Sequence, residues 1–127
     1  MSCNLINDDD DAQRARIRDI VSRIRDGFNT RNIDVIMSFY HADFLHDGIY
    51  IDSQRSIWLE RFTMFDTLEI EVREIEIDEE FALARMILRF QDGETTHVIL
   101  APEMLGDMSY FYHKGEWRIH GNRSRDR

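Results

Sequence analysis

Two histidines are the residues of this sequence best suited to proton-transfer chemistry. His97 stands in a run of apolar, strand-forming residues, where an imidazole must find a hydrogen-bond partner or line a cavity. His46 has Asp43 and Asp47 close by, and a carboxylate that fixes the tautomer of an imidazole produces an oriented general base. We therefore take His46 and His97 as candidate catalytic residues. The alternatives are a hydrogen-bonded core histidine for His97, and a pocket-lining or surface position for His46.

Aromatic side chains are the second chemical feature, because rings with a polar edge suit the binding of a flat organic molecule. Their spacing is also that of ordinary core residues, so both interpretations stay open. The candidate ligand-binding residues are Tyr40, Phe44, Tyr50, Trp58, Phe62, Tyr112 and Trp117. Arg123 is a further partner for a carboxylate ligand, although its position near Arg125 and Arg127 is more typical of a solvated tail.

A metal or cofactor site finds little support. His41, Asp43, His46 and Asp47 are close in sequence, and imidazoles and carboxylates are ligands of zinc and iron. Their spacing fits no HExxH helix, and a strand followed by a turn points such side chains in different directions. The chain also contains no GxGxxG, P-loop or GxSxG motif, so we expect no metal and no other cofactor.

The composition fits a single small domain. The chain has 127 residues, 43% of them hydrophobic, with eight Phe, four Tyr and two Trp for a core. Its net charge of −9 repels phosphate backbones and anionic membrane surfaces, so we expect neither nucleic acid nor membrane as a partner.

Cys3 is the single cysteine, which excludes an intrachain disulfide. Without a basic start, an apolar leader or an apolar run of about 18 residues, the sequence predicts a cytoplasmic location.

Apolar residues at helical spacing predict three helices in the first half of the chain. The acidic run 8–11 would start the first helix, because negative charge complements the positive end of the helix dipole. Its apolar stripe is Ile17, Ile20, Val21, Ile24 and Phe28. A second, short helix would follow Asn32 as its cap, and a third would span residues 53–65, capped by Asp52 or Ser53.

From Leu68 the apolar period changes from 3.6 to 2, which indicates strands. The apolar phase flips between Val72 and Ile75, so we expect a bulge at Arg73-Glu74 that bends the strand. Asp92-Gly93 predicts a hairpin turn in which Gln91 pairs with Glu94 and Leu88 faces His97. Lys114-Gly115 predicts a second hairpin, with Tyr112 opposite Trp117 and Tyr110 opposite Ile119.

Helices followed by antiparallel strands predict an α+β domain. We expect three N-terminal helices packed on a strongly curved, mainly antiparallel sheet of four to six strands. The domain would span residues 12–124, preceded by a poorly ordered acidic segment at 1–11 and followed by a tail at 125–127.

Two segments and the order of the elements resemble a known family. Residues 32–44, NIDVIMSFYHADF, look like the second helix and following strand of the nuclear transport factor 2-like superfamily, and residues 115–120, GEWRIH, look like its last strand. This superfamily includes SnoaL-like polyketide cyclases, ketosteroid isomerase and scytalone dehydratase. The resemblance covers about residues 12–124. It implies a cystatin-like cone with a deep pocket between the helices and the concave sheet face, and commonly a homodimer through the outer sheet face, but no single chemistry.

The resemblance and the candidate residues together predict a SnoaL-like protein that binds a small, fairly apolar organic molecule. Its polar contacts would be His46, His97 and Tyr40. In a sharper form of this hypothesis, one of the histidines takes a proton while a tyrosine hydroxyl donates to the developing oxyanion. The histidine pair fits dehydratase-like chemistry. Isomerase-like chemistry is poorly supported, because the apolar strand face between Phe81 and Phe90 has no carboxylate.

The sequence leaves open whether the protein is an enzyme. The alternative is a non-catalytic association module with a filled or vestigial pocket. Its outer sheet face, with Arg85, Ile87, Arg89 and Val98, would then pair with a partner chain.

Overall fold

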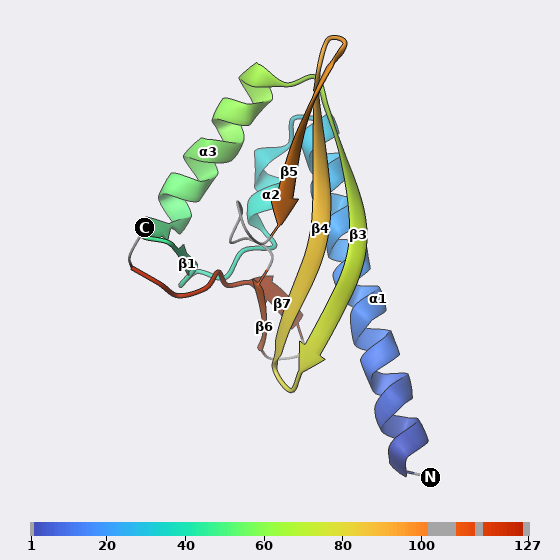
Figure 1. The fold of residues 1–127 in the computed structure, drawn as a ribbon. Coiled ribbons are helices and arrows are strands. Elements are labelled where there is room, and N and C mark those ends of the chain that lie inside the picture. Colours follow the sequence, from blue (N-terminus) through green and yellow to red (C-terminus); the bar gives the residue numbers. More distant parts are fainter. Residues whose placement is uncertain (1, 102–108, 114–115, 126–127) are drawn as a thin grey trace.

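A computed structural model describes residues 2–101, 109–113 and 116–125, with side chains for residues 10–100 and 116–125 (Figure 1). The helices are α1 (Ser2–Asn29), α2 (Ile33–Met37) and α3 (Ile51–Met64). A short hairpin of β1 (Leu45–His46) and β2 (Ile49–Tyr50) lies between α2 and α3. The remaining strands are β3 (Thr67–Asp78), β4 (Phe81–Asp92), β5 (Thr95–Ala101), β6 (Ser109–His113) and β7 (Glu116–Ile119).

These last five strands form one antiparallel sheet. β3 pairs with β4, whose other edge pairs with β5 over Met86–Asp92 and with β6 over Phe81–Leu83. β7 pairs with β6, and the predicted partners Tyr112–Trp117 and Tyr110–Ile119 are confirmed, while the Lys114-Gly115 turn lies outside the described residues. Figure 1 shows α1 running along β3 and β4, and α3 standing on the side of β5. The predicted α+β architecture of three helices and a curved antiparallel sheet is confirmed.

The predicted stripe of α1 forms the centre of the core. All five of its residues are buried, and Phe28 is completely so, which contributes about 2–3 kcal/mol of hydrophobic stabilisation. Asn29 fixes the end of the helix to β3: its side chain donates to Leu68 O at 3.1 Å and accepts from Leu68 N at 2.8 Å. Arg14 Nε donates to Ile75 O at 3.0 Å, so α1 is held to β3 on both sides of the bend.

The predicted bulge in β3 is confirmed. The pairing of β3 with β4 shifts between Val72 and Glu74. Leu68 on one side of the shift and Ile75 on the other are both buried, although they differ by an odd number of residues. The extra residue therefore lets both halves of a bent strand face the same core.

Two predicted helix starts are wrong, and one predicted cap is confirmed. α1 begins at Ser2, so the acidic run 8–11 lies within the helix. α3 begins at Ile51, with Tyr50 in the cap position and no side-chain cap bond, because the chain turns directly from β2 into the helix. Asn32 caps α2 as predicted, its Oδ1 accepting from Val35 N at 3.2 Å.

The β4–β5 register differs from the prediction by two residues. Asp92 pairs with Thr95 and Phe90 with His97, so the loop is Gly93-Glu94 instead of Asp92-Gly93. The predicted turn needs a positive φ at Asp92, whereas in this hairpin Gly93 has it, at 61°. Asp66 Oδ2 accepts from Gly93 N at 2.9 Å and fixes this loop. A two-residue shift keeps the strand faces, so His97 still shares a face with Phe90.

The C-terminal segment is held against the β1–β2 hairpin. Leu45 N donates to His120 O at 3.2 Å, Arg123 N to Leu45 O at 2.8 Å, and Gly48 N to Ser124 O at 2.9 Å. Gly121 lies between these bonds with φ of 81°. In the described part of the chain, no helix is long and apolar enough to cross a membrane.

Gly121→Ala tests this contact. A Cβ at this position would lie 2.3 Å from Leu45 O, and the backbone has a positive φ, so we expect a loss of about 3 kcal/mol in the free energy of unfolding. The control is Gly93→Ala, which also has a positive φ but meets no atom within 4 Å, and it should cost about 1 kcal/mol. Urea unfolding measures both, and equal losses would contradict the close contact at Gly121.

Candidate functional site

Four of the candidate ligand-binding residues lie in the core, and three of them are close to one another. Tyr40, Phe44 and Trp58 are almost fully buried. The Tyr40 hydroxyl accepts hydrogen bonds from Trp58 Nε1 at 2.8 Å and from Gln54 Nε2 at 3.2 Å. This cluster joins α3 to the segment before β1 and satisfies two buried donors.

The other aromatic candidates are dispersed. Phe62 packs on Phe28, with ring centroids 5.2 Å apart. Trp117 is buried and its Nε1 donates to Gln13 Oε1 at 2.8 Å, whereas Tyr50 is 54% exposed. The side chain of Tyr112 lies outside the described residues. The described candidates therefore do not line one common cavity, and their contact with a ligand stays a prediction.

Aromatic rings fill the interior between α1, α3 and β4. The Phe28 ring lies 6.1 Å from Trp58, 5.2 Å from Phe62 and 5.4 Å from Phe90, measured between centroids. Phe65 lies 4.8 Å from Phe90 and extends the cluster toward β5. Rings at these distances are in direct contact, so this part of the cone has no room for a ligand.

His46 has a partner on each ring nitrogen. Its Nδ1 accepts from Asn122 N at 3.2 Å, and its Nε2 lies 3.2 Å from Asp47 Oδ2. A nitrogen that accepts from a backbone N–H carries no proton, so the proton lies on Nε2 and faces the carboxylate. The expected carboxylate partner is therefore present, but neither nitrogen of this 9%-exposed side chain is directed at a ligand.

His97 has a different environment. It lies on β5, exposed to solvent, and its ring is 5.1 Å from that of Phe65. Among the described residues its imidazole makes no hydrogen bond, so it is not a hydrogen-bonded core histidine. His46 and His97 contact different residues, and the structure does not bring them together at one site.

Arg61 lies in an unusual environment and was not among the candidate residues predicted from the sequence. Its guanidinium lies over the Trp58 ring at 4.9 Å and over the Phe90 ring at 5.6 Å, measured from Cζ. Its Nη1 is buried, and no hydrogen-bond acceptor for it exists among the described residues. The signal was present in the sequence, because Arg61 stands in the apolar stripe of α3 between Trp58 and Phe65.

Arg31 shows how such a guanidinium is normally satisfied. It also lies over two rings, at 5.1 Å from Phe28 and 5.6 Å from Phe62. Its nitrogens donate to the carbonyl oxygens of Phe28, Phe65 and Asp66 at 2.9, 2.7 and 3.1 Å. Arg61 has the same aromatic contacts without these acceptors.

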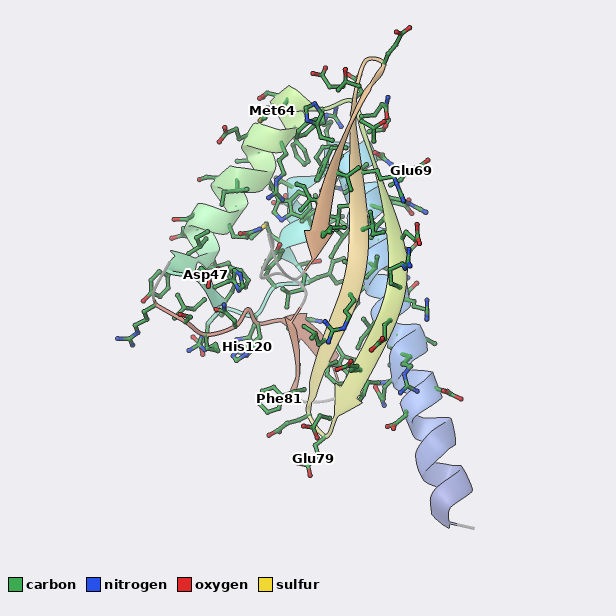
Figure 2. All side chains as sticks on the ribbon, in the orientation of Figure 1. Asp47, Met64, Glu69, Glu79, Phe81 and His120 are labelled. Atoms are coloured by element: carbon green, nitrogen blue, oxygen red, sulfur yellow. The ribbon has the colours of Figure 1, made fainter. Side chains whose placement is uncertain are left out.

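A cleft of about 450 Å³ lies elsewhere, between the β3–β4 hairpin and the C-terminal segment. Its lining is Glu76, Asp78, Phe81, Ala82, Leu83, His120, Gly121, Asn122 and Arg123. Figure 2 labels Phe81 and His120 on this side of the molecule. Several of its polar groups are already bonded within the chain: Glu76 to Arg85 at 3.3 Å, Asn122 to Asp47 at 2.7 Å, and Arg123 to the carbonyl of Asp43.

His120 in this cleft has a perturbed acidity. Burial lowers the pKa of its imidazole below the ordinary value, and the charges of Arg123 and His41 lower it further, while Asp43 opposes them. The His41 ring lies 5.5 Å away, and its Nδ1 accepts from Asp43 N at 3.0 Å. No three His, Cys, Asp or Glu side chains in the described part of the chain are grouped so as to hold a metal ion.

The sequence matches no protein-family model, and a search of curated proteins finds no match. Solved structures are similar in fold. Bd1075 of Bdellovibrio bacteriovorus is 13% identical with a TM-score of 0.66, over 87% of this chain, which spans 40% of that one. A nuclear transport factor 2-like protein of unknown function from Pseudomonas putida is 17% identical with a TM-score of 0.61, over 86% of this chain and 82% of that one.

A third structure is a protein from Novosphingobium aromaticivorans whose assignment as a scytalone dehydratase is provisional. It is 12% identical with a TM-score of 0.64, over 90% of this chain and 83% of that one. Identities this low show the fold alone, and they agree with the resemblance found in the sequence.

The lowered pKa of His120 predicts a pH-dependent stability. The unfolded chain binds a proton below about pH 6.5 more readily than the folded chain does, so acidification through this range favours unfolding. The stability that the folded chain gains by keeping His120 neutral is fully present above about pH 6.5, and it is lost as the pH falls. Urea unfolding at several pH values should show a shallower decline for His120→Gln than for the wild type. An identical dependence of the free energy of unfolding on pH in both proteins would contradict the lowered pKa of His120.

Proposed function

We propose that this chain, which has the nuclear transport factor 2-like fold, binds a small, fairly apolar organic molecule at a rim between α3 and β5. The rim consists of Phe65, Phe90 and His97. The observation that carries the proposal is the Phe65 ring, which contacts the buried Phe90 at 4.8 Å and the exposed His97 at 5.1 Å. The aromatic interior therefore continues to the protein surface.

The physical chemistry of the rim suits such a ligand. A flat apolar molecule placed against His97 and the 9%-exposed Phe65 would bury the apolar surface that it covers, which is favourable at about 25 cal/mol per Å². His97 supplies one hydrogen-bond donor and one acceptor that no described residue uses. Because the rings around Phe28 fill the deep part of the cone, the ligand would lie at the rim.

The proposal includes no reaction. Acid–base chemistry on one molecule needs its acid and base within hydrogen-bonding reach of that molecule. His46 is bonded to Asn122 and Asp47, away from His97, which supports binding in preference to catalysis.

The test is a matched pair of Phe→Leu variants. Binding of flat aromatic fragments is followed by ligand-observed NMR, and the site is mapped from ¹H–¹⁵N shift changes. Phe65→Leu should weaken binding at least about tenfold, because it removes the central ring of the rim. Phe81→Leu, on the cleft, should leave it unchanged. Loss of binding in Phe81→Leu alone would show that the fragments bind in the cleft and not at the rim. A complete absence of binding fragments would overturn the proposal.

The outer sheet face favours a second candidate, an association module. Val98 and Leu100 on this face are 57% and 47% exposed, and they pair across the strands with Arg89 and Ile87. The charges around them are already paired: Arg89 Nη1 lies 3.1 Å from Glu71 Oε1, whose pKa this hydrogen bond lowers. An apolar patch bordered by internally paired charges supports self-association, with a homodimer as the expected product.

Val98→Asp tests this second candidate. A carboxylate in the centre of the apolar patch would have to be buried without a partner, so the variant should be monomeric. Met64→Asp is the control, because Met64 is 50% exposed on α3 and lies on another surface. Sedimentation analysis measures the assembly state, and a wild-type monomer or a Val98→Asp dimer would contradict the interface.

A further inference from the structure

We infer that the molecule bound at the rim carries a carboxylate and that the guanidinium of Arg61 binds it. The inference rests on the proposed binding function and adds the charge and chemical class of the ligand. It assigns a binding role to a residue of α3 that faces the aromatic interior.

Arg61 has unmet hydrogen-bonding capacity. A guanidinium has five N–H donors and stays charged at all accessible pH values. Its Nη1 is removed from solvent, and within the described part of the chain it has neither an acceptor nor a salt bridge. A buried donor without a partner costs free energy, and for a charged group the cost is larger.

Arg31 differs from Arg61 in its hydrogen bonds. Both side chains lie over aromatic rings, but Arg31 reaches three backbone carbonyl oxygens. At Arg31, stacking on rings is thus accompanied by three hydrogen bonds to backbone carbonyl oxygens. At Arg61 the acceptors are missing, which indicates that they come from a molecule outside the described chain.

Arg61 also lies next to a residue of the rim. Arg61 lies over the Phe90 ring at 5.6 Å, and Phe90 is the direct cross-strand partner of His97. Phe65 contacts both the Phe90 and the His97 rings. Phe90 is therefore next to both Arg61 and His97, which brings the guanidinium close to the rim.

These features specify a flat, apolar carboxylic acid. Its carboxylate would accept a hydrogen bond from the guanidinium, and its apolar body would contact the edge of Phe65 beside His97. The chain as a whole has a charge of −9 and repels anions, so binding of such a molecule depends on this local cation.

The experiment compares 2-naphthoate with 2-naphthamide, which has the same shape and no charge. NMR titration should show 2-naphthoate binding to the wild type at least tenfold more tightly than 2-naphthamide. Arg61→Met should abolish this preference, and Arg61→Gln should do the same if the first variant folds poorly. Arg23→Met is the matched control, because Arg23 lies exposed on α1 in an ion pair with Asp19, and it should keep the full preference.

The outcomes separate the two proposals. Equal binding of both compounds at the rim would overturn the carboxylate inference and leave the binding function intact. No shift changes at the rim with either compound would overturn both. The melting temperature adds an independent readout: loss of an unpaired buried charge should leave Arg61→Met as stable as the wild type or more stable. A lower melting temperature with unchanged 2-naphthoate preference would show that Arg61 is structural.

Discussion

The packing of Phe28 is the constraint on which the rest of the structure depends. This fully buried ring is the point where α1, α3 and β4 meet, through Trp58, Phe62 and Phe90. Close contact among four large rings fixes the distance between the helices and the sheet. It also occupies the depth of the cone, so any ligand surface is displaced to the margin of the aromatic cluster.

The aromatic interior determines how cations can be accommodated beside it. A guanidinium stacked on rings loses water, and the cation–π attraction replaces only part of that hydration. At Arg31, hydrogen bonds to backbone carbonyl oxygens replace the rest of the lost hydration. These oxygens are available because the chain bends around Arg31 at the end of α1 and at the α3–β3 connection. Arg61 lies in the last turn of α3, and no described residue supplies an acceptor for its buried Nη1.

The outer sheet face follows a different physical pattern. Its carboxylates and guanidinium groups lie side by side on β3 and β4, so they neutralise one another at exposed positions. The neighbouring carboxyl group of Glu76 raises the pKa of Glu74. Each exposed pair contributes little to stability, but together the pairs leave Val98 and Leu100 as the distinctive feature of the surface.

Local sequence patterns determined much of the architecture. The stripe from Ile17 to Phe28, the cap at Asn32 and the phase flip around Glu74 depend on residues within a few positions of each other, and all three predictions are confirmed. The helix starts were less predictable, because α3 begins directly at the end of β2, without a side-chain cap. The predicted inward-facing positions of β4 and β5 are correct even though the predicted register is not, because a shift of two residues preserves the strand faces.

The tertiary structure alone decided the register and the candidate site. The loop at Gly93 is fixed by Asp66, which is 27 residues earlier in the chain, and no local turn preference contains that contact. His46 and His97 were both candidate catalytic residues from the sequence, yet one is bonded on both nitrogens and the other is exposed beside Phe65. Arg61 was visible as a cation in an apolar stripe, but its missing acceptor is a property of everything packed around it. Hydrogen-bond satisfaction is set by neighbours in space, which a pattern along the chain does not specify.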